Sequence, residues 1–166
     1  MQKITSFLWF DHQAEAAAKF YTSVFKKSKI RQITRYGESG SKVAGRPAGS
    51  VMTVDFDLAG QRFTALNGGP IFKFNESISF VVRCDTQREI DYYWKKLSAG
   101  GDRKSQMCGW LKDRHGLSWQ IVPSILPLLM STPAKAERVM AAVLEMKKLD
   151  LAKLKRAAAG ERRSRR

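Results

Sequence analysis

Few residues of this chain have the type and spacing needed for acid–base, nucleophilic or metal chemistry. The candidates are two histidines, His12 and His115, two cysteines, Cys84 and Cys108, and Asp113. Cys108 could act as a nucleophile only beside a base, and no Ser-His-Asp or Cys-His pair can be named from the sequence. Asp113 lies at a predicted hairpin corner, where turn geometry alone favours aspartate. We therefore name no catalytic residue, and we expect surface roles for the histidines and packing roles for the cysteines.

The elements that would position a site follow an internal repeat with an offset of 74 residues. Segments 4–25 and 78–97 each contain a short apolar strand, an aspartate and a helix with adjacent aromatic residues. Asp11 and Asp85 are the matching aspartates, and an aromatic residue follows each of them nine positions later. The repeat predicts two similar modules packed together, with a cleft where they meet.

We predict an α+β fold of two βαβββ modules, whose curved mixed and antiparallel sheets surround a cleft, with helices at the C-terminal end. Asp11 is a candidate N-cap for the first helix. Segment 37–49 contains four glycines and one proline and is predicted to be a mobile loop. It is not predicted to bind phosphate, because it lacks the strand–GxGxxG–helix context of a phosphate-binding turn. The first module covers residues 1–70, with a helix at 14–25 and strands at 3–10, 29–36, 50–57 and 61–67.

The second module covers residues 71–123 and is predicted to repeat the same order of elements. Its strand lies at 77–83, its helix at 86–99, and its hairpin pairs 107–112 with 117–122. A helical extension is predicted at 124–160, where an apolar stripe would pack on the body of the protein or on a dimer partner. Residues 161–166 (ERRSRR) offer nothing to pack and are predicted to be a disordered basic tail.

The composition is that of a globular protein, with 43% hydrophobic residues and a formal net charge of +15. Residues 131–166 contain 11 of the 30 Lys and Arg residues. The apolar run at the N-terminus is too short for a secretion signal, and the run at 121–130 is too short to cross a membrane. Two cysteines are too few for a disulfide framework. These features predict a cytoplasmic protein outside the membrane.

Two long motifs, FTALNGGPIFKFNESISF at 63–80 and CGWLKDRHGLSWQIVP at 108–123, together with the repeated modules, resemble the vicinal oxygen chelate (glyoxalase/bleomycin-resistance/dioxygenase) superfamily. The closer resemblance is to its PhnB-like branch, labelled as a 3-demethylubiquinone-9 3-methyltransferase domain, and it covers residues 3–158. In metal-using members of the superfamily, the first and last strands of each module supply His, Glu or Gln to a divalent cation in the cleft. The resemblance puts Ser6, Asn67, Ser79 and Gln120 at those four positions.

The neutral hydroxyl and amide oxygens of these four residues are weak ligands for transition metals, so we expect neither a metal nor a cofactor. Because one face of a strand recurs at every second position, Ser79 brings Arg83 into the predicted cleft. Trp119 is expected in the core, whereas Trp110 belongs either to the core or to the pocket wall. The predicted ligand-binding residues are Ser6, Asn67, Ser79, Arg83, Trp110 and Gln120.

Such a cleft suits a small, partly apolar organic ligand whose charge Arg83 could match. The leading interpretation is a metal-free small-molecule binding protein or an enzyme of the glyoxalase-like class, working as a homodimer. One alternative is methyltransferase activity on a quinone precursor, as the branch label suggests, although the Gly-rich turn usual for S-adenosylmethionine is missing. Another is nucleic-acid binding through the basic C-terminal residues, which no recognised motif supports.

Overall fold

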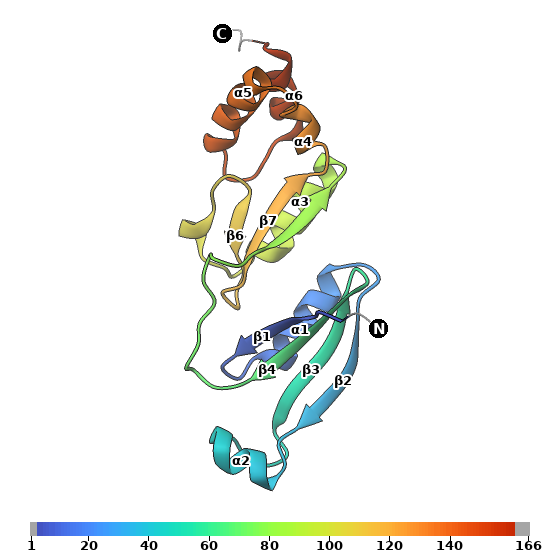
Figure 1. Ribbon diagram of the computed structural model, residues 1–166, viewed down its shortest axis with the longest axis vertical. Coiled ribbons are helices and arrows are strands. Elements are labelled where there is room, and N and C mark those ends of the chain that lie inside the picture. Colours follow the sequence, from blue (N-terminus) through green and yellow to red (C-terminus); the bar gives the residue numbers. More distant parts are fainter. Residues whose placement is uncertain (1–2, 162–166) are drawn as a thin grey trace. The chain divides into compact units, whose positions relative to one another are not determined.

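The computed structural model describes residues 3–161 of the chain. The chain divides into two compact units, the first ending at Phe74 and the second beginning at Asn75, and each unit is described by itself (Figure 1). Of the predicted basic tail, residues 162–166 lie outside the described residues. No helix in the described part of the chain is long and apolar enough to cross a membrane.

The first unit is a four-stranded mixed sheet with a helix on one face. The helix α1 (Ala14–Val24) packs against β3 and β4. β1 runs parallel to β4, and the other neighbouring pairs are antiparallel. The spatial order is β1-β4-β3-β2, from the strands β1 (Ser6–Phe10), β2 (Lys29–Arg35), β3 (Val51–Leu58) and β4 (Gln61–Asn67).

Small and aromatic residues explain how α1 lies on this sheet. Ala14, Ala17 and Tyr21 of the helix have no exposed surface. The Tyr21 ring stacks on Phe56 of β3, and Phe56 stacks on Phe63 of β4 with ring centres 5.5 Å apart. Because side chains alternate along a strand, these residues mark the covered face. The opposite face, called the first open face below, carries Phe7, Trp9, Thr53, Asp55, Thr64 and Leu66.

The glycine-rich segment 37–49 contains a short helix, α2 (Glu38–Ala44), so the prediction of a loop throughout is wrong. Gly45 ends the helix in the left-handed conformation, with φ of 61°. None of the residues of α2 is buried. The helix therefore lacks the apolar periodicity by which a sequence reveals a helix.

The second unit has a three-stranded sheet in the order β5-β7-β6, with β5 parallel to β7. Its elements are β5 (Phe80–Cys84), α3 (Gln87–Ser98), β6 (Trp110–Lys112) and β7 (Ser118–Pro123). The order is thus β-α-β-β, which corrects the predicted βαβββ module. The segment before β6 forms a short 3-10 turn, η1 (Arg103–Ser105), because the Asp102 side chain accepts a hydrogen bond from the Lys104 amide at 2.8 Å.

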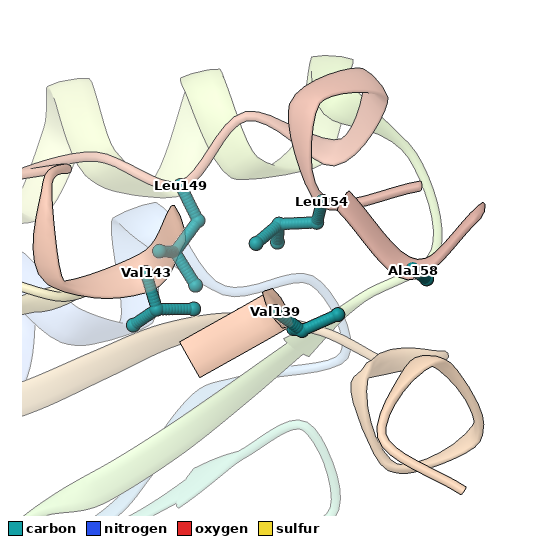
Figure 2. Packing of buried hydrophobic residues seen from close by; sticks show 5 residues of the cluster. All are labelled: Val139, Val143, Leu149, Leu154 and Ala158. Carbon is teal, nitrogen blue, oxygen red and sulfur yellow. The ribbon is translucent and has the colours of Figure 1, made fainter. Parts of the chain in front are cut away.

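The chain ends in three helices that belong to the second unit: α4 (Leu126–Leu129), α5 (Pro133–Leu144) and α6 (Leu151–Ala159). Figure 1 shows them gathered at the end of the sheet where β7 ends. Thr132 and Asp150 cap α5 and α6 by accepting backbone hydrogen bonds. Figure 2 shows the buried cluster that holds these helices together, made by Val139, Val143, Leu149, Leu154 and Ala158.

Candidate functional site

Asn67, at the end of β4, is a structural residue of the first unit. It is only 7% exposed, and its Oδ1 accepts a hydrogen bond from the Ala14 amide at 2.8 Å. Its Nδ2 donates to the Val51 carbonyl at 3.0 Å, and its own carbonyl accepts from the Tyr36 hydroxyl at 2.7 Å. Asn67 therefore provides the hydrogen-bond acceptor for the first amide of α1, a role that the sequence predicts for Asp11. The Asn67 side chain does not reach the first open face.

Ser6 shares the covered face with Asn67, so the predicted orientation of both residues is wrong. Ser6, Leu8 and Phe10 of β1 lie opposite Phe63, Ala65 and Asn67 of β4. Leu8 and Phe10 are buried, as expected for side chains that pack under α1. A shift of one residue exchanges the two faces of a strand. The predicted faces of β1 and β4 differ from the structure by such a shift.

The first open face presents an aromatic cluster at the end of β1. Trp9 contacts Phe72 edge-on, with ring centres 5.0 Å apart, and its Nε1 donates to the Gly69 carbonyl at 2.9 Å. A Cβ atom on Gly68 would lie 2.3 Å from the Trp9 ring, so only glycine fits at this position. Phe7 remains 59% exposed. This face is mainly apolar and aromatic at its β1 side.

Charged residues surround the end of β1 beside this aromatic cluster. Arg46 donates to the Asp11 carboxylate at 2.5 Å and also to the Asp11 carbonyl. His12 Nδ1 lies 3.2 Å from the other Asp11 oxygen. The hydrogen bond from Arg46 lowers the pKa of Asp11, with a further contribution from His12. Asp11 is therefore the anionic partner of two basic side chains, and the predicted surface role of His12 agrees with its 64% exposed side chain.

In the second unit, the residues that face α3 and those on the opposite face of the sheet are the ones that the sequence predicts. Trp119 is buried against Phe80, with ring centres 5.6 Å apart, and its Nε1 donates to Asp113 Oδ2 at 2.8 Å. Asp113 Oδ1 accepts from the amides of His115 and Leu117. Asp113 thus shapes the hairpin turn, as predicted, and fixes Trp119 on the side of α3.

The opposite surface of this sheet, called the second open face below, brings together four of the predicted ligand-binding residues. Gln120 of β7 lies between Val81 of β5 and Trp110 of β6. Its Nε2 donates to the Ser79 hydroxyl at 2.9 Å, although Ser79 precedes β5 and does not form part of the strand as predicted. Val81 is 47% exposed, and Trp110 is half-buried. Trp110 therefore belongs to the open face.

Val81, Gln120 and Trp110 form the central row of the second open face, and one further cross-strand pair lies on each side of this row. Arg83 lies opposite Val122, and Lys112 lies opposite Ser118. Lys112 Nζ forms an ion pair with Glu76 at 2.5 Å, and this contact lowers the pKa of Glu76. Arg83 is exposed, and no carboxylate among residues 3–161 pairs with it. The second open face thus presents the apolar Val81 and Trp110 on either side of Gln120, which is hydrogen-bonded to Ser79, with the cationic Arg83 in the next row.

The donor set does not fit the divalent metal that the resemblance implies for other members of the superfamily. Ser79 and Gln120 offer only neutral oxygens, and Ser6 and Asn67 lie on the covered face of the first sheet. Within the described residues, no group of three or more His, Cys, Asp or Glu side chains could hold a metal ion.

The sequence repeat itself contained the signal that corrects the first unit. An offset of 74 residues matches Phe7 with Val81 and Trp9 with Arg83, whereas it matches Ser6 with the covered Phe80. The pairings agree, because Phe7 lies opposite Thr64 as Val81 lies opposite Gln120. Thr64 is therefore the counterpart of Gln120 in the first sheet.

The comparison with known proteins agrees with this architecture. The model of the 3-demethylubiquinone-9 3-methyltransferase family matches residues 2–122. The chain belongs to this family. The PhnB protein of Bacillus cereus, provisionally named a 3-demethylubiquinone-9 3-methyltransferase, is 38% identical, with 74% of this chain and 100% of that chain covered and a TM-score of 0.63. The predicted resemblance to the PhnB-like branch is thereby confirmed.

More distant solved structures are also similar. Protein PA1353 of Pseudomonas aeruginosa is 17% identical, covers 74% of this chain and 98% of its own, and has a TM-score of 0.58, which supports a shared fold. A glyoxylase/bleomycin resistance protein/dioxygenase domain from Frankia sp. EAN1pec is 12% identical, with coverage of 74% and 92% and a TM-score of 0.44. No curated protein matches the chain.

Proposed function

We propose that this PhnB-like chain binds a small, partly apolar organic anion on the second open face, without a divalent metal ion. The observation that carries the proposal is the row Val81, Gln120 and Trp110, together with the hydrogen bond from Gln120 to Ser79. Ligand sites commonly combine an apolar lining with a few convergent polar groups that fix orientation. The second open face has this composition.

The Gln120–Ser79 pair supplies the orienting polar groups. Because the Gln120 amide donates to the Ser79 oxygen, the Gln120 carbonyl oxygen and the Ser79 hydroxyl hydrogen remain as an acceptor and a donor. Gln120 lies next to Trp110 of β6, whose ring offers a large rigid surface for a planar ligand, and Ser79 lies on the β5 side of Gln120. A ligand with an aromatic or conjugated ring and one polar substituent would use all three side chains.

Arg83 supplies the charge preference. Its guanidinium is exposed next to the central row, and a guanidinium binds a carboxylate through two parallel hydrogen bonds. An anion would therefore gain a partner at Arg83, whereas a cation would be repelled. We expect a carboxylate or a similar planar oxyanion at this end of the ligand.

Calorimetric titration with benzoate, a small aromatic carboxylate, tests the proposal. We expect saturable binding to the wild-type chain, and at least about fivefold weaker binding to Gln120→Leu, which keeps the size but loses the amide. Thr64→Val is the matched control, because Thr64 is the counterpart of Gln120 in the first sheet. Equal binding to Gln120→Leu and the wild-type chain would contradict the proposed site.

Methyl transfer is a second candidate, and its support is the name of the family. In this reading the second open face would hold the methyl acceptor, a quinone precursor. Calorimetric titration with S-adenosylmethionine tests the candidate, since saturable heat is expected only if the chain has a site for that cofactor. A heat no larger than the heat of dilution would contradict methyl transfer from S-adenosylmethionine.

Two partner predictions complete the proposal. The resemblance implies a homodimer. Light scattering during size-exclusion chromatography should therefore give twice the 18.8 kDa mass of one chain. A single-chain mass at all concentrations would contradict this. Nucleic acid is not a proposed partner, so duplex DNA should not bind even at low salt, where the net charge of +15 favours phosphate contacts most.

A further inference from the structure

Ser118, the first residue of β7, carries a buried hydroxyl on the second open face. The residue is only 1% exposed, and its Oγ has no hydrogen-bond partner among residues 3–161. Because Ser118 lies two positions before Gln120, the two side chains are on the same face of the strand. A buried hydroxyl without a partner destabilises a fold, so such a group in a native protein needs an explanation. Ser118 is thus a donor that lacks an acceptor on the face proposed to bind the ligand.

Lys112 of β6 lies next to this hydroxyl. Lys112 and Ser118 are cross-strand neighbours, and the side chains of such a pair lie within contact distance. Lys112 Nζ forms an ion pair with the Glu76 carboxylate at 2.5 Å, and the side chain of Lys112 is 23% exposed. An ammonium group has three N–H donors, of which this ion pair uses one. Lys112 and Ser118 together therefore offer several donors at one corner of the second open face.

Glu76, on the segment that precedes β5, places a carboxylate at this corner. Its side chain is 61% exposed, so water screens its ion pair with Lys112 and the pair contributes little to stability. The hydrogen bond from Lys112 lowers the pKa of Glu76, which keeps the carboxyl ionised at neutral pH. The corner therefore already accommodates a carboxylate of the protein itself, and a carboxylate of a ligand could replace it.

Arg83 lies at the opposite corner of the same face. It belongs to β5 and to the row of Val122, whereas Lys112 belongs to β6 and to the row of Ser118. Four residues along β7 and two strand spacings across the sheet correspond to about 16 Å between the Cα atoms of Arg83 and Lys112. Gln120 lies midway between them.

A ligand that uses both corners must carry an oxyanion at each of its two ends. The side chains of Arg83 and Lys112 are long and flexible, so both can lean toward a ligand that is shorter than the span between their Cα atoms. One aromatic ring with carboxylates on opposite sides fits this arrangement. The ring would lie over the central row, and each carboxylate would meet one basic side chain.

We propose that the ligand of the second open face is a dianion, whose second oxyanion binds Lys112 and Ser118 at the corner opposite Arg83. This inference rests on the proposed function, because it specifies the ligand class of that same site. In the free protein Glu76 occupies the Lys112 ammonium. The second oxyanion of the ligand replaces the Glu76 carboxylate there and gives the Ser118 hydroxyl its acceptor.

Calorimetry on the full chain with three acids tests the inference. They are benzoate, terephthalate with its two carboxylates on opposite sides of the ring, and phthalate with its two carboxylates side by side. The wild-type chain should bind terephthalate about tenfold more tightly than benzoate, because a second charged contact forms. Phthalate cannot reach both corners and should stay within about twofold of benzoate.

Four variants locate the second oxyanion. Lys112→Gln should remove most of the gain for terephthalate and change benzoate binding by less than about twofold. Lys148→Gln is the matched control, since it removes the same charge from an ion pair of equal length, with Asp91 on α3. Glu76→Gln should strengthen terephthalate binding by about threefold, because the competing carboxylate is lost, and Ser118→Ala should weaken it by about threefold.

The outcomes separate the two proposals. If neither benzoate nor terephthalate binds the wild-type chain, the proposed function fails, and this inference fails with it. If benzoate binds and terephthalate binds no more tightly, the site for a second oxyanion is overturned while the proposed function stands. If Lys112→Gln and Lys148→Gln reduce the gain equally, the gain comes from net charge alone, which also overturns the inference. Thermal unfolding of each variant checks that the fold is retained.

Discussion

The side chain of Asn67 accepts a hydrogen bond from the amide of Ala14 at 2.8 Å, and this contact joins the end of β4 to the start of α1. It places Asn67 on the covered face of the first sheet, away from any ligand on the open face. The main role of Asn67 is therefore in stability. The same contact explains why α1 begins without a side-chain cap from its own preceding residue, Gln13.

Replacement of Asn67 should weaken the fold without affecting the ligand. We expect Asn67→Ala to lower the free energy of unfolding by about 1–2 kcal/mol, because a helix amide loses its partner. Denaturant unfolding measures this change. Asn75→Ala is the control, since the exposed Asn75 only accepts from its neighbour Ser77, and its effect should stay within about 0.5 kcal/mol. Equal effects of the two changes would contradict the capping role.

Asp57 makes the first unit sensitive to acid. Burial raises the pKa of this carboxyl, but the hydrogen bonds from Arg31 at 2.6 Å and Arg62 at 3.0 Å outweigh burial, so the pKa is lowered overall. A carboxyl with a lowered folded-state pKa stabilises the fold above its unfolded pKa of about 3.9, and this stabilisation is lost as the pH falls through the folded pKa.

The corresponding variant should lose stability at neutral pH only. Asp57→Asn should lower the free energy of unfolding by about 1–2 kcal/mol at pH 7, and the difference from the wild-type chain should shrink below about pH 4. Unfolding curves at several pH values measure this. Asp55→Asn is the control, because an amide oxygen can still accept from the Thr64 hydroxyl. A difference that grows in acid would refute the assignment.

The two cysteines should differ in reactivity. Burial, with the nearby Glu89 and Asp85 carboxylates, raises the pKa of the Cys84 thiol to about 12, and the residue is only 1% exposed. Cys108 is half-buried. Because the thiolate is the reactive form, a thiol reagent at pH 8 should modify Cys108 first and leave Cys84 until unfolding. Cys108→Ser should remove the fast phase, and a fast phase that persists would show that Cys84 is accessible.

Metal addition should leave the second open face unchanged. After dialysis against a chelator, zinc, manganese or magnesium should neither bind stoichiometrically nor shift the unfolding temperature, since neutral oxygens hold these ions weakly. Metal analysis of the dialysed and reloaded protein measures binding. One equivalent of tightly held ion, lost in Gln120→Leu, would contradict the metal-free proposal.

Much of the fold could be predicted because local patterns and long-range packing agree. The capped start of α5 after Thr132 and the turn at Asp113 have local causes that the sequence displays. The helix α2 escaped prediction because it buries no residue and contains Gly40. Within residues 3–161 the second sheet has three strands instead of the predicted four, because the segment after α3 forms a 3-10 turn capped by Asp102.

The faces of the strands that carry the candidate site were predictable in one unit and not in the other, for a single physical reason. Strand faces alternate with every residue, so an error of one position in aligning Ser6 and Asn67 exchanged the faces of the first sheet. In the second sheet, Trp119 was correctly placed under α3, and that fixed Gln120 on the opposite side. The contact of Val122 with the C-terminal extension depends on tertiary packing, and no local pattern announces it.

The most direct test of the proposed site is a titration with benzoate followed by the indole N–H signals of the four tryptophans in nitrogen–proton correlation spectra. The account predicts that the Trp110 signal shifts and saturates, while that of the buried Trp119 barely moves. Arg83→Gln should weaken this response by about tenfold, because it removes the charged partner of the carboxylate, whereas Arg88→Gln, an equal loss of charge on α3, should not. A Trp110 signal that stays in place, or a response that both arginine variants weaken equally, would contradict the account.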